Sequence, residues 1–232
     1  MLVNNFPEEL IAPMIGAAVT MLVLVWWIFH LAAKRLMSSI LIGIILSAWL
    51  LAVYFLSPSG FFFKLSLWPL PNIGLIFIPI ITGASVLAGS AAFQKIVDNI
   101  FQPWLIGVQV MRVMGASFLA LYARGLMPAE FAIPSGIGDI VIGAAAPVVA
   151  IILFFNQSFG RKLAIVWNIA GFLELANAIV LGFLTSPTPY QLLSLDNPNI
   201  FLFDFPLALI PGFAVPLSLL LHIFSLRVLF KK

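Results

Sequence analysis

Long runs of apolar residues recur along the whole chain, separated by short polar segments. The runs cover residues 10–31, 38–56, 73–93, 104–123, 133–155, 163–184 and 207–226. Each is roughly 19 to 24 residues long, enough for a helix to cross the hydrocarbon core of a bilayer. The runs lack the alternation of barrel strands, and lipid offers no partner for exposed backbone groups, so each run should be helical. The pattern predicts an all-α, single-domain integral membrane bundle of seven transmembrane helices.

Composition agrees with this pattern. The 232 residues are 63% hydrophobic and 8% charged, whereas soluble domains are about 45 to 50% apolar and about 25% charged. These values exclude a soluble enzyme, a disordered protein and a nucleic-acid-binding protein. The chain contains no cysteine, which excludes disulfides, zinc-thiolate sites, iron-sulfur clusters and thiol nucleophiles.

The third run, 73–93, is the least regular. It contains Pro79 and three glycines, so it could be short or broken. An amphipathic piece at 91–102 would then follow in the membrane interface, where its polar residues fit: Gln94, Lys95, Asp98 and Asn99. Pro206, Pro211 and Pro216 predict kinks in the last run.

Basic residues predict the orientation of the bundle. The odd-numbered loops and the C-terminal end carry Lys34, Arg35, Lys95, Arg161, Lys162, Arg227, Lys231 and Lys232, whereas the even-numbered loops carry only Lys64 and Arg124. Because basic loops stay in the cytoplasm, we expect the N-terminus outside and the C-terminus in the cytoplasm. Residues 1–9 lack the basic stretch of a signal peptide, so the first run should be an uncleaved span.

The two long outer loops, 57–72 and 185–206, are aromatic rather than charged. Their aromatic residues include Phe61, Phe62, Phe63, Trp68, Phe201, Phe203 and Phe205. These rings could form a cover over the outer mouth of the bundle, or they could belong to the aromatic belt at the membrane surface. The belt is the favoured interpretation.

Arg112, Asp139 and Glu174 are charged residues inside predicted helices. Each needs a partner, because a charge at bilayer depth costs several kcal/mol. Arg112 and Glu174 lie at matching depths, about 12 and about 16 Å from the cytoplasmic ends of their helices. We therefore expect an ion pair between them, with Asp139 as a second acceptor about one turn further out.

Small residues surround these charges. Asp139, Gly143, Ala146 and Ala150 form a narrow stripe on which another helix could pack closely. Gln109, Arg112 and Gly115 are spaced by three residues, as are Asn168, Gly171, Glu174 and Asn177. Each step of three turns an α-helix face by about 60°, so only one of the two asparagines can share a face with Glu174.

The candidate binding residues are therefore Gln109, Arg112, Asp139 and Glu174, with Asn168 or Asn177. They could line a polar cavity for a substrate, an ion or protons, since ionisable residues in spans are functional candidates. They could equally be a structural lock that sets helix register. Both interpretations remain open.

His30 and His222 both lie near the predicted inner ends of their helices, the first and the last. In a ring of seven helices they could meet and ligate a haem or a metal. Isolated histidines near helix ends are more often interfacial or hydrogen-bonded, so we expect no cofactor and no metal. The chain offers no lysine deep in a helix for a retinal Schiff base and no recognisable catalytic motif.

Several sequence motifs stand out from residue 109 onward: Gln109-Val-Met-Arg112-Val-Met-Gly115, Gly125-Leu-Met-Pro128-Ala-Glu-Phe131-Ala, Gly136-Ile-Gly138-Asp139-Ile, Trp167-Asn168-Ile-Ala-Gly171 and the proline-rich last run with His222. Through them, residues 109–226 resemble uncharacterised bacterial multi-pass membrane proteins. The resemblance implies seven spans in a bacterial inner (plasma) membrane. It implies no activity and no catalytic residue.

These observations favour a small transporter or channel in the bilayer, with a small molecule or protons as its substrate and with no nucleic-acid partner. Arg112 would bind an anionic group or balance Glu174, and Asp139 or Glu174 would handle protons. One alternative is a non-catalytic sensor or assembly partner with a structural polar lock. Another is an enzyme acting on a lipid or isoprenoid under the aromatic loops, although an enzyme is the less favoured class. A homo-oligomer is compatible with each.

Overall fold

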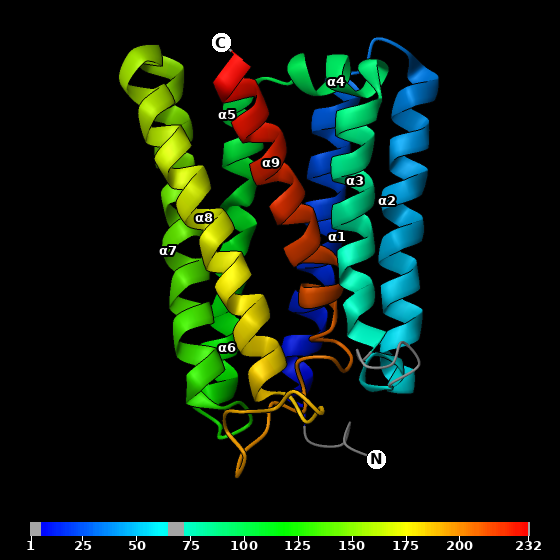
Figure 1. The fold of residues 1–232 in the computed structure, drawn as a ribbon, viewed down its shortest axis with the longest axis vertical. Coiled ribbons are helices and arrows are strands. Elements are labelled where there is room, and N and C mark those ends of the chain that lie inside the picture. The colour runs from blue at the N-terminus through cyan, green and yellow to red at the C-terminus, as the bar shows by residue number, and fades with distance from the viewer. Residues whose placement is uncertain (1–5, 65–71, 232) are drawn as a thin grey trace.

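Seven upright helical segments make up the bundle in the computed structural model, which describes residues 6–64 and 72–231 (Figure 1). They are Glu8–Ala32, Leu36–Ser59, Asn72–Gly89, Gln102–Tyr122, Ala129–Phe155, Gln157–Thr185 and Ile210–Lys231. Each is long and apolar enough to cross a membrane, and the described residues contain no strand. The predicted number of helices and the all-α class are confirmed, and the chain is a membrane protein.

Some of these segments are composite. The long α-helices are α1 (Glu8–Ala32), α2 (Leu36–Leu56), α3 (Phe77–Gly89), α7 (Ala129–Phe155), α8 (Gln157–Thr185) and α9 (Val215–Lys231). Shorter α-helices are α4 (Ala91–Asp98), α5 (Gln102–Gly107) and α6 (Ala116–Tyr122). Between them lie 3₁₀ turns η2 (Ser57–Ser59), η3 (Phe61–Phe63), η4 (Asn72–Ile76) and η5 (Val108–Gly115), and the π-helix η6 (Ile210–Ala214).

The last helix, α9, stands inside the bundle between the α7–α8 pair and the α1–α3 group (Figure 1). It contacts α8, α3, α5 and α4, and 72% of the most apolar stretch of the last span, Ile210–Lys231, is buried. A helix that is apolar on every side is favoured in such a central position. The sequence interpretation of a ring, with the first and last helices as neighbours on its rim, does not describe this arrangement.

The third span is short, and the predicted break is confirmed. The helix ends at Gly89, four residues before the expected 93, and α4 lies across the end of the bundle (Figure 1). Ser90 starts the new helix, because its side chain accepts a hydrogen bond from the Phe93 amide at 3.2 Å. Val97 of α4 is fully buried, which holds α4 against the bundle.

Several helix boundaries differ from the apolar runs. α7 starts at Ala129 rather than 133, and α8 starts at Gln157 rather than 163, with only Asn156 between the two helices. The last span begins at Ile210 and reaches Lys231, rather than covering 207–226. Hydropathy alone misplaced this span because residues 201–209 are apolar but form a buried loop, which is tolerated where protein covers the backbone.

Three phenylalanines of the predicted outer loops pack inward. Phe62, Phe201 and Phe203 are buried, at 4%, 5% and 2% exposed, and the Phe203 ring contacts those of Phe63 and Phe183. This burial favours the cover over the belt. Trp68, the other member of the expected aromatic set, lies outside the described residues.

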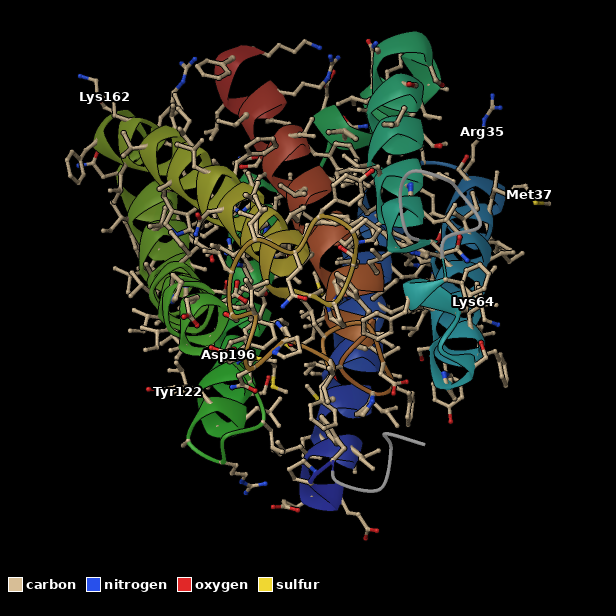
Figure 2. The ribbon with its side chains drawn as sticks, turned by 60° about the horizontal axis from the view of Figure 1, so that its bottom comes forward. Arg35, Met37, Lys64, Tyr122, Lys162 and Asp196 are labelled. Atoms are coloured by element: carbon tan, nitrogen blue, oxygen red, sulfur yellow. The ribbon has the colours of Figure 1, made fainter. Side chains whose placement is uncertain are left out.

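Basic residues gather at one end of the bundle. The α1–α2 turn, α4, the start of α8 and the end of α9 all lie at the end where the chain terminates (Figure 1). Figure 2 labels Lys162 on the α7–α8 side and Arg35 on the α1–α2 side of that end. Lys64 and Arg124 follow the opposite ends of their helices. Lys232 lies outside the described residues.

Candidate functional site

Arg112 lies at the centre of a buried polar cluster. Its Nε donates a hydrogen bond to Asp139 Oδ1 at 2.8 Å, and its Nη2 forms an ion pair with Glu174 Oε2. Its Nη1 also donates to the Gly171 carbonyl oxygen at 3.3 Å. The side chains of Arg112, Asp139 and Glu174 are only 4%, 9% and 13% exposed. The expected Arg112–Glu174 pair is present, and Asp139 pairs directly rather than lying one turn further out, because α7 begins four residues earlier than expected.

The helix around Arg112 is wound as a 3₁₀ helix, η5, rather than an α-helix. Three residues make one turn of a 3₁₀ helix, so side chains three apart lie on one face. Gln109, Arg112 and Gly115 are accordingly all buried, whereas Val110 and Val113 are 37% and 38% exposed. The 3₁₀ winding therefore places Gln109, Arg112 and Gly115 in one column, whereas an α-helix would distribute residues with this spacing around its surface.

Glycines allow the helices to approach closely around the cluster. A Cβ on Gly143 would lie 2.8 Å from the Val113 backbone nitrogen, and one on Gly171 would lie 2.6 Å from His222 Nε2 and 3.1 Å from Arg112 Nη1. Larger side chains there would push η5 and α9 away. The expected close packing along the stripe of Gly143, Ala146 and Ala150 is confirmed, since these residues are buried.

His222 of α9 extends the cluster, and its contacts define its tautomer. Arg112 Nη1 lies 3.3 Å from His222 Nε2, and His222 Nδ1 lies 2.9 Å from Asn168 Oδ1. Because a guanidinium only donates, Nε2 must accept, and Nδ1 must carry the proton that it donates to Asn168 Oδ1. The imidazole is therefore neutral in this arrangement.

The network continues from Asn168 toward the basic end of the bundle. Asn168 Nδ2 donates to the Ala164 carbonyl oxygen at 2.7 Å and to Ser225 Oγ at 2.9 Å. Gln102 Nε2, at the start of α5, donates to both the carbonyl oxygen and the Oγ of Ser225. A continuous series of hydrogen bonds therefore connects Arg112 with Gln102, across α8, α9 and α5.

Two small cavities border Asp139. One, of about 50 Å³, also touches Arg112, Ser218 and Met111. The other, of about 30 Å³, extends to Leu202 and Phe203 of the loop before η6. A water molecule needs at least about 10–15 Å³, so each cavity could hold a few waters at most. Neither could hold an organic substrate in this conformation.

The structure gathers five of the six candidate residues. Arg112, Asp139, Glu174 and Asn168 share the network, and Gln109 of the same η5 face donates through Nε2 to the Ser218 carbonyl oxygen at 3.1 Å. Asn177 instead has an exposed side chain on α8. Sequence reasoning missed His222, Ser225 and Gln102 as members. A corrected boundary for the last helix would have placed His222 near mid-helix rather than near its end.

The other histidine, His30, makes its contacts with residues outside this network. His30 Nδ1 lies 2.8 Å from Ser39 Oγ, between α1 and α2, and its ring packs against Trp26 and Trp27. His222 instead contacts Arg112, Asn168 and the Trp167 ring, so the two histidines have different partners and do not meet. Within 6–64 and 72–231, no group of three or more His, Cys, Asp or Glu residues could hold a metal ion.

The charges of the cluster are unequal. One guanidinium faces two carboxylates, and the adjacent imidazole is neutral in the observed hydrogen-bond pattern. A buried cluster with an uncompensated charge is unfavourable. It becomes neutral when one carboxylate takes up a proton. The arrangement therefore has a place for a single proton on one of its two carboxylates.

Comparison with known proteins shows the family but no activity. Residues 70–230 match a domain of unknown function, DUF8737. Neither the curated proteins nor the solved structures that were searched contain a match. The matched range includes every residue of the network described above. Because the match covers more than half of the chain, the protein belongs to the DUF8737 family.

Proposed function

We propose that the protein is a small proton transporter of a bacterial inner membrane, with its N-terminus outside and its C-terminus in the cytoplasm. The orientation is supported by the excess of Lys and Arg at the end of the bundle that carries α4 and the C-terminus. The bacterial inner membrane rests on the resemblance of residues 109–226 to bacterial membrane proteins.

The observation that carries the proposal is one arginine held by two carboxylates inside the bundle, Asp139 and Glu174. Two carboxylates beside one guanidinium leave a net negative charge, which favours the binding of a proton. Because the site is buried, release of that proton requires a change in the surroundings of the carboxylates. The adjoining cavities of about 50 and 30 Å³ have room for a few water molecules each. A proton is a substrate that this space admits, and the excess carboxylate favours a proton.

A route follows from the surroundings of the cluster. From the outer side, a proton would reach Asp139 through the cavities beneath Leu202 and Phe203. On the inner side, the hydrogen bond between His222 and Asn168 and the one from Asn168 to Ser225 block the route. Arg112 holds its protons permanently and cannot pass them on. Release to the cytoplasm therefore requires α9 to shift, and the irregular helices η5 and η6 are sites where such a rearrangement is favoured.

Proton flux into vesicles tests this proposal. Purified protein is reconstituted with an internal pH-sensitive dye, and a pH gradient is imposed with potassium and valinomycin present to remove the opposing voltage. We expect flux above that of protein-free vesicles for the wild type and for Glu8→Gln, an exposed carboxylate with the same chemical change. Glu174→Gln leaves Arg112 balanced by Asp139 alone, so it should fold and lose the flux. Wild-type flux equal to that of empty vesicles contradicts transport.

A structural lock is the second candidate, and the direct pairing of nearly dry side chains favours it. For a lock alone, Arg112→Ala lowers the melting temperature by leaving two buried carboxylates unpaired, and removing Glu174 as well restores part of the loss. The two candidate functions differ in what they predict for proton flux. A transporter loses its flux in Glu174→Gln, whereas a structural lock shows no flux in the wild type or in the variant.

A further inference from the structure

A second polar feature lies at the basic end of the bundle, where Gln102, the last member of the hydrogen-bond series from Arg112, lines part of its wall. It is a groove of about 1020 Å³ between the start of α5, the α7–α8 turn and the end of α9. Its polar wall includes Arg161, Lys162 and Ser158, and its apolar wall includes Phe101, Ile165 and Val228. The proposed transport route gives this groove no role.

The free charge of the groove is positive. Asp98, its acidic residue, already pairs with Arg227 at 3.2 Å and with Lys231 at 2.5 Å. Burial raises the pKa of Asp98, but the hydrogen bonds from Lys231 and Arg227 outweigh it and hold this pKa below its ordinary value. In the part of the chain that the structure describes, Arg161 and Lys162 belong to no ion pair. They are available to an anion.

The basic and apolar parts are arranged as a phospholipid would require. Arg161 and Lys162 lie in the second turn of α8, at the end of the bundle, and Figure 2 shows Lys162 extending beyond the helices. Ile165 lies one turn further along α8, and Phe101 exposes 42% of its surface beside it in the groove. A headgroup would sit at the end of the bundle, and an acyl chain would follow the apolar wall toward the membrane centre.

We propose that this groove binds an anionic phospholipid, with its phosphate held by Arg161 and Lys162 and an acyl chain against Phe101 and Ile165. Basic pockets between membrane helices on the cytoplasmic side bind such headgroups in general. The first turn of α8, a helix of 29 residues, adds the partial positive charge of its N-terminus to the same wall. Arg161, Lys162 and the apolar wall carry the proposal without it.

Binding of phosphatidylglycerol to the full chain in detergent tests the proposal, with phosphatidylcholine as the zwitterionic comparison and native mass spectrometry as the readout. The test variant is Arg161→Gln with Lys162→Gln. The control is Lys34→Gln with Arg35→Gln, which removes the same two residue types from the α1–α2 turn at the same end. Melting temperatures of all variants establish that each is folded.

We expect the wild type and the control to prefer phosphatidylglycerol, and the test variant to bind it about 25-fold more weakly, or about fivefold for each charge removed. Equal weakening in both variants would mean attraction by overall charge and overturns the site, as does equal binding of the two lipids. An excess of inorganic phosphate should not displace the lipid. If phosphate alone binds through Arg161 and Lys162 and displaces it, the groove serves a soluble phosphate ligand instead.

Discussion

Arg112 organises the interior of the protein because it satisfies polar groups from three other helices. It contacts Asp139 of α7, Glu174 of α8 and His222 of α9. Removing a partner from such a network leaves a buried donor or acceptor without a bond, which costs about 1–3 kcal/mol per group. Substitutions within the network should therefore lower the stability of the protein strongly, although they do not change its surface.

The two asparagines of α8 provide a matched comparison at this scale. Asn168→Ala removes the partners of His222 Nδ1 and Ser225 Oγ, so we expect a loss of about 1–3 kcal/mol, seen as a lower melting temperature in detergent. Asn177→Ala changes an exposed side chain of the same type, and its effect should stay within about 0.5 kcal/mol. Equal effects of the two substitutions would contradict the network.

Sequence reasoning could identify the charged members of the site but not all of their partners. Arg112, Asp139 and Glu174 stand out because a charge in an apolar run needs compensation. Choosing between Asn168 and Asn177 required knowing which face of α8 meets α9. His222 was assigned to a helix end because the apolar loop 201–209 moved the predicted last helix toward the N-terminus.

The helix that carries Arg112 departs from α-geometry where it passes α7. η5 presents Gln109, Arg112 and Gly115 on one buried face, and Gly143 of α7 allows its backbone to approach. Hydropathy reports only that this segment is apolar, so neither its 3₁₀ winding nor the π-helix η6 could be predicted from the residues. Both irregular helices lie beside the cluster.

Close contact between η5 and α7 can be tested with two glycines. Gly143→Ala would place a Cβ 2.8 Å from the Val113 backbone nitrogen, so we expect a loss of about 1–3 kcal/mol and a lower melting temperature. Gly16→Ala in α1 meets no atom within 4 Å and should leave stability unchanged or slightly higher. A harmless Gly143→Ala would show that η5 and α7 are further apart.

At the scale of the whole molecule, seven helices, their order and the excess of basic residues at one end follow from patterns along the chain. The central position of α9 does not, because hydropathy cannot distinguish a side facing lipid from a side facing another helix. Lipid and protein interior are similarly apolar, so packing decides which helix is enclosed.

The proposed orientation can be measured directly, because the chain has no native cysteine. Asp196→Cys introduces one thiol in the loop after α8, and Lys162→Cys introduces one in the second turn of α8; Figure 2 labels the two residues on different parts of the molecule. In intact cells, we expect a membrane-impermeant maleimide to label Asp196→Cys and to reach Lys162→Cys only after permeabilisation. The reverse pattern would place the basic end outside.

The most direct test of the central claim is the infrared spectrum of the cluster, which reports whether one carboxyl group holds a proton. We expect the wild type and Glu8→Gln to show a protonated-carboxyl band that shifts in heavy water. Glu174→Gln and Asp139→Asn should each abolish it, because one guanidinium then faces one carboxylate and neutrality needs no proton. If the folded wild type shows no such band at neutral pH, where exposed carboxylates are ionised, both carboxylates of the cluster are ionised too and the cluster does not bind a proton.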